Sequence, residues 1–313
     1  MKLDFRQVAS RIIKAVFLLA VIIFFILLIT SIPKNFDIRY FRGNYEATHS
    51  LGEILNLMKQ NILSFFRGEI GGVQVEGSTV QEIFMVSFLK SATVLVFSLI
   101  VSFVLGLTLG VLVGALPKRN QASNTLAMLP MSVPDVFTIS VVQFFALYLF
   151  RNQIKFFGVG PIEHKGDAFW YSSLFPIIAI SIIPIFHMMV TVIKTIEQEQ
   201  TKPYVLALRG KGMAKSYIIR VHMRKIIIYN LLSTMPSVLT IMFSSLIIVE
   251  NVFFYRGMGY QMVNIFRSTK VTPVESQALF TYFLIMMAIF YFIFYGIINI
   301  IKRYALPDLN EEL

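Results

Sequence analysis

Six long apolar stretches divide the chain. The first, residues 15–32, contains no charged residue and as a helix would extend about 27 Å, close to the roughly 30 Å hydrocarbon core of a bilayer. The other five are residues 91–116, 122–150, 174–193, 226–249 and 277–301. The pattern predicts an all-α, polytopic membrane protein with six transmembrane helices, whose two termini lie on the same side.

The first stretch also has the basic flank of a signal peptide. Its apolar run exceeds the usual length of about 7–15 residues, and it ends in Ser-Ile-Pro-Lys without a small-x-small cleavage site. We therefore expect it to be retained as the first transmembrane helix.

The distribution of Lys and Arg predicts the orientation, because these residues accumulate in cytoplasmic segments. Sixteen lie in the N-terminus, the turn at 118–119, the loop 194–225 and the pair at 302–303, against eleven spread over the longer segments on the other side. Both termini are predicted to be cytoplasmic. The expected organisation is a cytoplasmic N-terminus (1–14), a first helix (15–32), an external loop (33–86), a five-helix core (87–302) that contains the cytoplasmic loop 194–225, and a cytoplasmic tail (303–313).

The external loop mixes charged and apolar residues. Within it, apolar residues recur near helical spacing, which predicts a short amphipathic helix; they are Leu51, Ile54, Leu55, Met58 and Ile62. A Gly-rich patch between residues 68 and 77 predicts a turn before the second span.

Composition supports the membrane assignment and narrows the chemistry. The 313 residues are 56% hydrophobic and 14% charged, with a mean hydropathy of +0.72, which excludes an ordinary soluble enzyme. The net charge of +11 indicates a membrane surface rather than nucleic acid, because the apolar runs leave no room for a basic DNA-binding face. The chain has no Cys, and its four His residues are too dispersed for a metal site.

Known catalytic and nucleotide-binding motifs are absent from the sequence. The stretch Gly210-Lys211-Gly212 superficially resembles a phosphate-binding loop, but Met213 stands where Ser or Thr should coordinate magnesium. No H-E-x-x-H or G-x-S-x-G motif is present. We expect no catalytic residue, cofactor site or metal site in this chain.

Two ionisable residues lie within the predicted spans, where burial of charge is costly. Asp135 is flanked by Pro130 and Pro134, which should kink the third span. Asp135 is either a polar residue at a helix break or a residue that lines a transport pathway, and His187 in the fourth span has the same two interpretations.

Gly106, Gly110 and Gly114 repeat every four residues in the second span. This spacing places them on one helix face and predicts a seam where another helix packs closely. A flexible gating hinge is the alternative.

The loop 194–225, hereafter the basic loop, carries eight basic and two acidic residues. Pro203 favours a short helix, which Gly210 and Gly212 should end, and a second helix from Ala214 should run into the fifth span. The result would be a cytoplasmic knob. The residues expected to make its apolar contacts are Tyr204, Val205, Leu208 and Met213. The residues expected to form its basic rim are Arg209, Lys211 and Lys215. A basic loop that faces lipid headgroups is the alternative.

The segment from residue 204 to 222 resembles the EAA loop of ABC-importer permeases, particularly the oligopeptide and dipeptide family, whose version reads Y-V-x-x-A-x-A-K-G with a His about ten residues later. The residues that match this version, or the middle alanine of EAA itself, are Tyr204, Val205, Ala207, Arg209, Lys211, Gly212 and His222. The departures are Leu206, Leu208, Gly210 and Asn230.

Other segments resemble the same family. Residues 11–33 are similar to the entry of its first-permease (B-type) subunit, and residues 91–115 to its second span. SVPDVF resembles its I-P-x-F element, with Asp135 as a departure, and residues 250–266 resemble E-x-x-F-x-x-P-G-L-G, with Phe253 retained. Pro307-Asp308 is a loose match to a D-P tail motif. Possible pathway or gate residues are Asp135, Glu250, Gly257, Gly259 and Arg256, which replaces the family proline.

The resemblance implies a non-catalytic permease of a type I ABC importer in a bacterial cell membrane. The basic loop would act as a coupling helix on one of two cytoplasmic ATPases, which hold ATP and Mg. A second permease and an extracytoplasmic binding lipoprotein would complete the complex. Peptide is the expected cargo, with nickel or a metal-chelator complex as the alternative. A secondary transporter or channel, which would need coupling charges or an inverted repeat, and a membrane enzyme are the competing classes.

Overall fold

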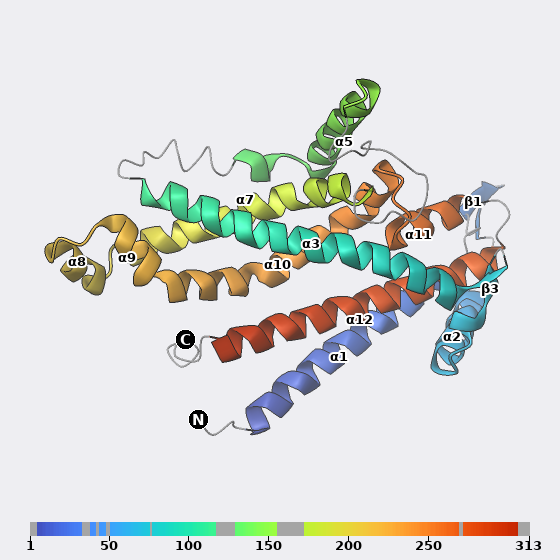
Figure 1. Cartoon of the computed structure of the whole chain (residues 1–313). Coiled ribbons are helices and arrows are strands. Elements are labelled where there is room, and N and C mark those ends of the chain that lie inside the picture. Colours follow the sequence, from blue (N-terminus) through green and yellow to red (C-terminus); the bar gives the residue numbers. More distant parts are fainter. Residues whose placement is uncertain are drawn as a thin grey trace. The chain divides into compact units, whose positions relative to one another are not determined.

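The computed structural model of the chain is mostly helical (Figure 1) and describes residues 5–32, 38–41, 44–47, 51–75, 77–116, 129–154, 172–268 and 272–305. It divides into two compact units. Unit 1 comprises residues 1–88 and 261–294, and unit 2 comprises residues 89–260 and 295–313. Predictions for residues 1–4, for Lys118 and Arg119, for parts of the external loop, and for Pro307-Asp308 lie outside the described residues.

Unit 1 begins with the long helix α1 (Phe5–Thr30) and the amphipathic helix α2 (Leu51–Phe66). The Asn61 amide of α2 donates to the Ser31 hydroxyl at 3.0 Å, just after α1 ends. The sequence did not predict the two small antiparallel hairpins of this unit, in which β1 (Ile38–Phe41) pairs with β2 (Asn44–Ala47) and β3 (Gln74–Val75) pairs with β4 (Ser78–Thr79). A short 3-10 helix, η1 (Ile70–Gly72), precedes the second hairpin. Helix α2 is the amphipathic helix that the apolar spacing predicts.

Helix α3 (Val80–Ala115) begins earlier than the sequence predicts, within the segment assigned to the external loop. A capping box explains this start, because Thr79 and Glu82 exchange hydrogen bonds: the Glu82 N–H donates to Thr79 Oγ1 at 3.2 Å, and the Thr79 N–H donates to Glu82 Oε2 at 2.9 Å. Within unit 1, the buried Phe84 of α3 packs against Phe283 of α12 (Pro273–Ala305). The helix thus starts where its exposed amides find partners.

Unit 2 contains the rest of α3 and the helices α5 (Asp135–Arg151), α7 (Leu174–Glu199) and α10 (Arg224–Val252). Figure 1 shows α3, α7 and α10 alongside one another, with the short helices α8 (Pro203–Gly210) and α9 (Lys215–Val221) at one end of the unit. The last turns of α12 contact α10, where the Lys302 ammonium lies 4.1 Å from the ring centre of Tyr229. The core of this unit is the contact of α7 with α10 and α5.

Five helices of the described residues are long and apolar enough to cross a membrane: Ile13–Thr30, Val80–Ala115, Leu174–Glu199, Arg224–Val252 and Glu275–Lys302. The expected third span differs. Residues 129–132 form a 3-10 helix, η2 (Leu129–Ser132), and α5 begins only at Asp135 and has 17 residues. The expectation of one helix through 122–150 is therefore wrong at 129–134, and residues 122–128 lie outside the described part. The kink expected from Pro130 and Pro134 is a complete break, because Pro134 lacks the N–H that would continue the helix.

The glycine seam packs α3 against α7. A Cβ atom built on Gly106 would lie 2.5 Å from the Met188 Cβ, and one on Gly110 would lie 2.6 Å from the Val192 Cβ. At Gly114 the neighbour would be the Ile196 Cδ1, also at 2.6 Å. Such distances are too short for real carbon atoms, so the two helices approach this closely only because α3 presents glycine. The packing-seam interpretation is confirmed.

Candidate functional site

The basic loop folds into two short helices between α7 and α10. Helix α8 follows α7 after a three-residue connection, with Pro203 at its first position. Helix α9 ends at Val221, and α10 begins at Arg224. The prediction that one helix runs from Ala214 into the fifth span is therefore wrong. The break lies at His222 and Met223, whose N–H groups both donate to the Ile218 carbonyl, at 2.9 and 3.1 Å, in a tightened helix end.

Gly212 forms the turn between α8 and α9 as the sequence predicts. Its φ is +78°, in the left-handed region that favours glycine. Its N–H donates to the Arg209 carbonyl at 2.9 Å, and the Met213 N–H donates to the Leu208 carbonyl at 3.3 Å. Gly210 is different, since it is the last residue of α8 and has no positive φ.

This difference gives a matched pair of variants. Both glycines have open space around them, because a Cβ on either would meet no atom within 4 Å. We expect Gly212→Val to strain the turn by about 1–2 kcal/mol and to lower cargo uptake at unchanged abundance, since a β-branched residue resists the left-handed region. Gly210→Val should leave uptake near the wild-type level. Equal uptake by the two variants, measured in cells at equal abundance, would contradict this account of the turn.

Helix α8 buries one side chain and exposes most of the others. Val205 is fully buried, whereas Leu206 is 55% exposed and Tyr204 is 40% exposed. Ala207, Arg209 and Lys211 are exposed, and Leu208 and Met213 are half-buried. The exposed side chains of α8 and its C-terminal cap therefore combine an apolar residue, Leu206, with two cations, Arg209 and Lys211.

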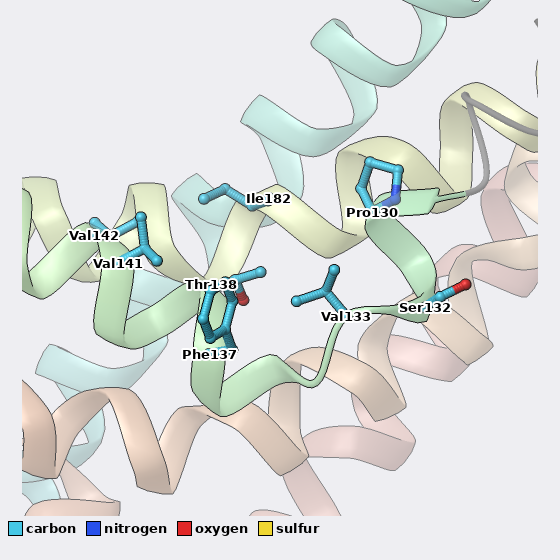
Figure 2. Close-up of a pocket in the computed structure, with 8 residues that line it drawn as sticks. All are labelled: Pro130, Ser132, Val133, Phe137, Thr138, Val141, Val142 and Ile182. Carbon is cyan, nitrogen blue, oxygen red and sulfur yellow. The ribbon is translucent and has the colours of Figure 1, made fainter.

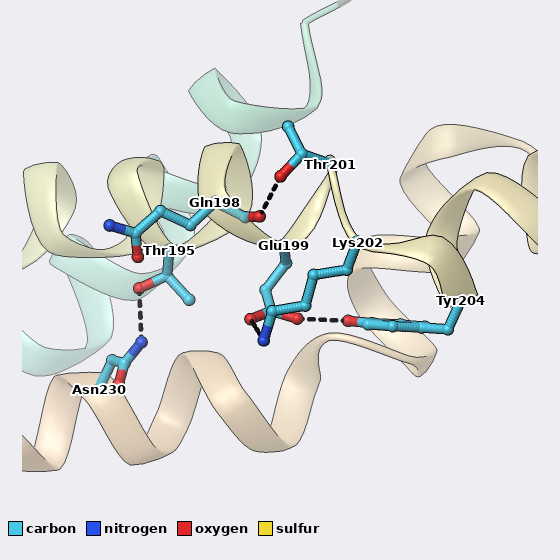
Figure 3. A network of polar contacts seen from close by, with 7 residues as sticks. All are labelled: Thr195, Gln198, Glu199, Thr201, Lys202, Tyr204 and Asn230. Atoms are coloured by element: carbon cyan, nitrogen blue, oxygen red, sulfur yellow. Dashed lines mark hydrogen bonds and ion pairs between the residues drawn. The ribbon is translucent and has the colours of Figure 1, made fainter. Parts of the chain in front are cut away.

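A polar network joins α8 to the end of α7 (Figure 3). The Tyr204 hydroxyl donates to Glu199 Oε2 at 2.6 Å, and the Lys202 ammonium lies 2.7 Å from Glu199 Oε1. Glu199 is buried, with 6% exposure. Burial, together with the hydrogen bond to Glu199, raises the pKa of the Tyr204 hydroxyl, so it remains a donor at neutral pH. Hydrogen bonds to charged groups contribute about 1.5–3 kcal/mol each.

The same network continues along α7. Thr195, one turn before Glu199, accepts a hydrogen bond at 3.1 Å from the Asn230 amide of α10. Thr201 Oγ1 donates to the Gln198 carbonyl at 2.9 Å and closes the connection to α8. The end of α7 is therefore attached to α8 and to α10.

Lys215 was expected on the basic rim, but the structure places it inward. Its ammonium donates to the Leu116 carbonyl at 2.9 Å, at the end of α3. A cation at a helix C-terminus satisfies a free carbonyl and complements the helix dipole. His222 lies at the C-terminal cap of α9, with its ring centre 6.1 Å from that of Tyr217. The outward basic residues among the predicted ones are Arg209 and Lys211.

A second polar cluster surrounds Glu250 near the end of α10. This carboxylate is fully buried. Its Oε1 accepts a hydrogen bond from the Ser91 hydroxyl of α3, and its Oε2 accepts from the N–H groups of Gly259 and Tyr260, at 2.6 and 3.2 Å. Ser91 Oγ in turn accepts from the Met258 N–H at 2.8 Å. Glu250 therefore caps the start of α11 (Met258–Arg267), where free N–H groups favour a negative charge.

Two glycines make room for this carboxylate. A Cβ on Gly257 would collide with the Glu250 carboxyl group and the Ser91 hydroxyl, and a Cβ on Gly259 would lie 2.6 Å from the Ile247 Cα. Arg256, which replaces the family proline, is exposed. The structure thus gives Glu250, Gly257 and Gly259 a shared structural role, and their expected role in a pathway or gate stays a prediction.

Asp135 lies at the first position of α5 and binds α10. Its Oδ2 accepts a hydrogen bond from the Ser245 hydroxyl at 2.6 Å. The other ionisable residue of the predicted spans, His187, is half-buried in α7. Asp135 therefore has a protein partner at a helix break, which agrees with the simpler of its two interpretations.

An apolar groove lies where η2 leads into α5 (Figure 2). Its cavity volume is about 600 Å³, within the range of small-molecule sites. The side chains that line it are Pro130, Ser132, Val133, Phe137, Thr138, Val141, Val142 and Ile182. None of these carries a charge, so an ionic ligand would find no counter-charge on this lining. Among the described residues, no group of three His, Cys, Asp or Glu side chains could hold a metal ion.

The sequence does not predict several partners in these networks. In the sequence, Glu199 is only one of the charges of the basic loop, Ser91 and Ser245 are polar positions in or beside apolar spans, and Asn230 is a departure from the family pattern. Their signal is weak, because a single polar residue near the end of an apolar helix does not reveal which distant residue it contacts.

Comparison with known proteins gives the family. Residues 102–308, more than half of the chain, match the model of the family described as binding-protein-dependent transport system inner membrane component. A comparison with curated protein sequences finds no match. The match covers the glycine seam, the basic loop and Glu250 with the start of α11. Members of this family work with ATPase and substrate-binding partners and are generally non-catalytic. The chain therefore belongs to the inner membrane components of binding-protein-dependent transport systems and is a multi-pass permease subunit of an ABC transporter in the cell membrane.

Proposed function

We propose that this permease imports peptides and that α8 is its coupling helix, which docks on a cytoplasmic ATPase subunit. The observation that carries this proposal is the exposed surface of α8 and its C-terminal cap, at one end of unit 2 (Figure 1), where Leu206, Arg209 and Lys211 are all exposed. An apolar centre with a charged rim is typical of a protein-binding surface. Family membership decides against a secondary transporter or channel, because ABC importers take their energy from ATP.

The proposal includes the arrangement of the complex. The chain would have six spans with both termini in the cytoplasm, α5 being part of the third span. As a subunit of the first-permease (B) type, it would pair with a second, related but distinct permease. Two ATPase subunits would hold ATP and Mg, and an extracytoplasmic lipoprotein would deliver the cargo. The excess of Lys and Arg on the side of the basic loop supports this orientation.

Peptide is proposed as the cargo because the basic loop and residues 250–259 resemble those of oligopeptide and dipeptide permeases. The apolar groove beside α5 can contact apolar side chains but offers no charge to a peptide terminus. Such a surface suits passage rather than tight binding, and recognition would then belong to the binding protein. A metal-chelator complex is the alternative cargo.

Recovery of partner proteins tests the docking surface. The tagged chain is extracted from its native membrane in mild detergent, and mass spectrometry quantifies the proteins that remain bound. We expect the wild-type chain to retain ATPase subunits and the double variant Leu206→Asp, Arg209→Glu to retain about tenfold less, which corresponds to about 1.4 kcal/mol of binding free energy. Arg220→Glu is the control, because Arg220 is also exposed but lies on α9 and bonds to its own helix through the Ser216 carbonyl at 3.2 Å.

Uptake tests the cargo. Cells that lack this chain should lose uptake of a radiolabelled tripeptide and regain it with the wild-type gene. Unchanged tripeptide uptake in the deletion strain, together with lost uptake of a nickel-chelator complex, would replace peptide by the alternative cargo.

In the recovery experiment, full retention of the ATPase subunits by the double variant Leu206→Asp, Arg209→Glu would show that α8 is not part of the interface.

A further inference from the structure

The joint between α7 and α8 is held by one buried carboxylate. Glu199 is the last residue of α7 and Tyr204 is the second residue of α8. The two are five positions apart, across a connection in which the Lys202 N–H donates to the Glu199 carbonyl at 3.1 Å. The side-chain contacts of Glu199 therefore fix the direction in which α8 leaves α7.

Helix α8 has few other attachments to the bundle. Val205 is its one buried side chain. A buried apolar side chain resists separation, but its contacts have no preferred direction, whereas a hydrogen bond is directional. The bond from Tyr204 Oη to Glu199 Oε2 therefore supplies the angle that Val205 alone leaves free.

We propose that Glu199 and Tyr204 form a clasp that keeps α8 rigid with α7, so that movement of a docked ATPase turns α7 rather than bending the joint. This inference rests on the proposed docking of α8. Both are positioning residues, because they act through α8 and touch neither cargo nor nucleotide.

The contacts of α7 connect the clasp to α10 and to α3. One turn before Glu199, Thr195 accepts the hydrogen bond from Asn230 of α10. Further along α7, Val192 and Met188 pack on the glycines of α3. These hydrogen-bond and packing contacts form a continuous connection from the clasp through α7 to α10 and α3.

Glu199 has two side-chain partners, Tyr204 and Lys202, and they should contribute unequally to holding the joint. Lys202 Nζ contacts Glu199 at 2.7 Å, but the Lys202 side chain is 53% exposed and the Glu199 side chain 8% exposed. An ion pair with one partner in water is weakened by solvent and by the entropy of the long side chain. The Tyr204 hydroxyl therefore carries more of the clasp than the Lys202 ammonium.

Spin labels measure the rigidity of the joint directly. The chain has no cysteine, so Lys194→Cys on α7 and Gly210→Cys at the end of α8 give two unique labels at exposed positions. In the intact complex we expect a narrow distance distribution between the labels. Tyr204→Phe, which retains the ring and removes only the hydroxyl, should widen that distribution at least twofold, and Lys202→Met should widen it less.

The functional readout is tripeptide uptake per ATP hydrolysed. Tyr204→Phe should lower this ratio at least fivefold while recovery of the ATPase subunits stays unchanged. Tyr217→Phe is the matched control, because Tyr217 is a 50% exposed tyrosine of α9 whose hydroxyl has no hydrogen bond to a residue that the structure describes. Tyr204→Phe should add nothing in a Glu199→Ala background, since the two residues act as a pair. Glu199→Met, which fills a similar volume but offers no acceptor oxygen, serves where Glu199→Ala does not fold.

Each outcome decides the inference. An unchanged label distribution or an unchanged ratio in Tyr204→Phe would overturn the clasp and leave the docking proposal standing. The clasp would also be overturned if the effects of Tyr204→Phe and Glu199→Ala on the uptake ratio multiplied in the double variant. Absence of ATPase subunits from the wild-type preparation would defeat the docking proposal first, and transmission through the clasp with it.

Discussion

Gly110→Val is expected to abolish transport, because it forces apart the helices α3 and α7. The first new atom would lie 2.6 Å from the Val192 Cβ and 3.0 Å from the Met189 carbonyl oxygen. The second of these is a backbone atom and cannot turn aside as a side chain could. Overpacking of this kind costs about 1–3 kcal/mol, and valine adds two further carbon atoms to the collision.

The measurement is the amount of monodisperse chain recovered in detergent after heating, together with uptake in cells. Gly296→Val is the matched control, since Gly296 is also a helix glycine but a Cβ there would meet nothing within 4 Å. We expect Gly110→Val to lose its monodisperse form several degrees below the wild-type chain and Gly296→Val to match it. Normal stability of Gly110→Val would show that α3 and α7 do not pack through the glycine seam.

Glu250→Ala is expected to be the most destabilising change near the end of α10. It leaves the Ser91 hydroxyl and the N–H groups of Gly259 and Tyr260 without their acceptor. A buried polar group that loses its partner costs about 1–3 kcal/mol, so the three together should cost on the order of 3–5 kcal/mol. The start of α11 should loosen as a result.

Glu250→Gln should lie between the wild type and the alanine variant, because the amide retains one acceptor oxygen but turns a donor toward the other partners. Glu69→Gln is the control for loss of charge. Its ion pair with Arg67, at 3.9 Å between exposed side chains, should contribute less than about 1 kcal/mol. Thermal unfolding of the detergent-solubilised chain ranks the stabilities of these variants. A wild-type unfolding temperature for Glu250→Ala would refute the capping role and favour a role for Glu250 in the pathway.

The local features of this fold could be predicted because their causes are local in the chain. Proline breaks the helix before Asp135, and Gly212 takes the left-handed angle that its turn requires. The repeat of Gly106, Gly110 and Gly114 predicts a packing seam from spacing alone. The apolar spacing of residues 51–62 predicts α2 for the same reason. The break of the second loop helix at His222 has no such signal, because neither proline nor glycine marks it.

The partners of the functional side chains could not be predicted, because they depend on contacts between distant residues. Asp135 is visible in the sequence as a charge in an apolar stretch, but its contact with Ser245, 110 positions away, is a product of packing. Lys215 has the composition of a rim residue and is drawn instead to the end of α3. Glu199 joins two helices only because α8 packs so that the Tyr204 hydroxyl lies beside its carboxylate.

Hydropathy, charge and short motifs are properties of the linear chain, so they are enough to indicate the membrane class, the ABC-permease family and the position of the basic loop. The folded chain was needed to show that α7 is the glycine seam's partner, that Glu250 caps α11, and that Glu199 joins α8 to α7. The physical reason is that a buried polar or close-packed contact is stable only when a particular partner arrives at the right distance, and that arrival depends on how the whole chain packs.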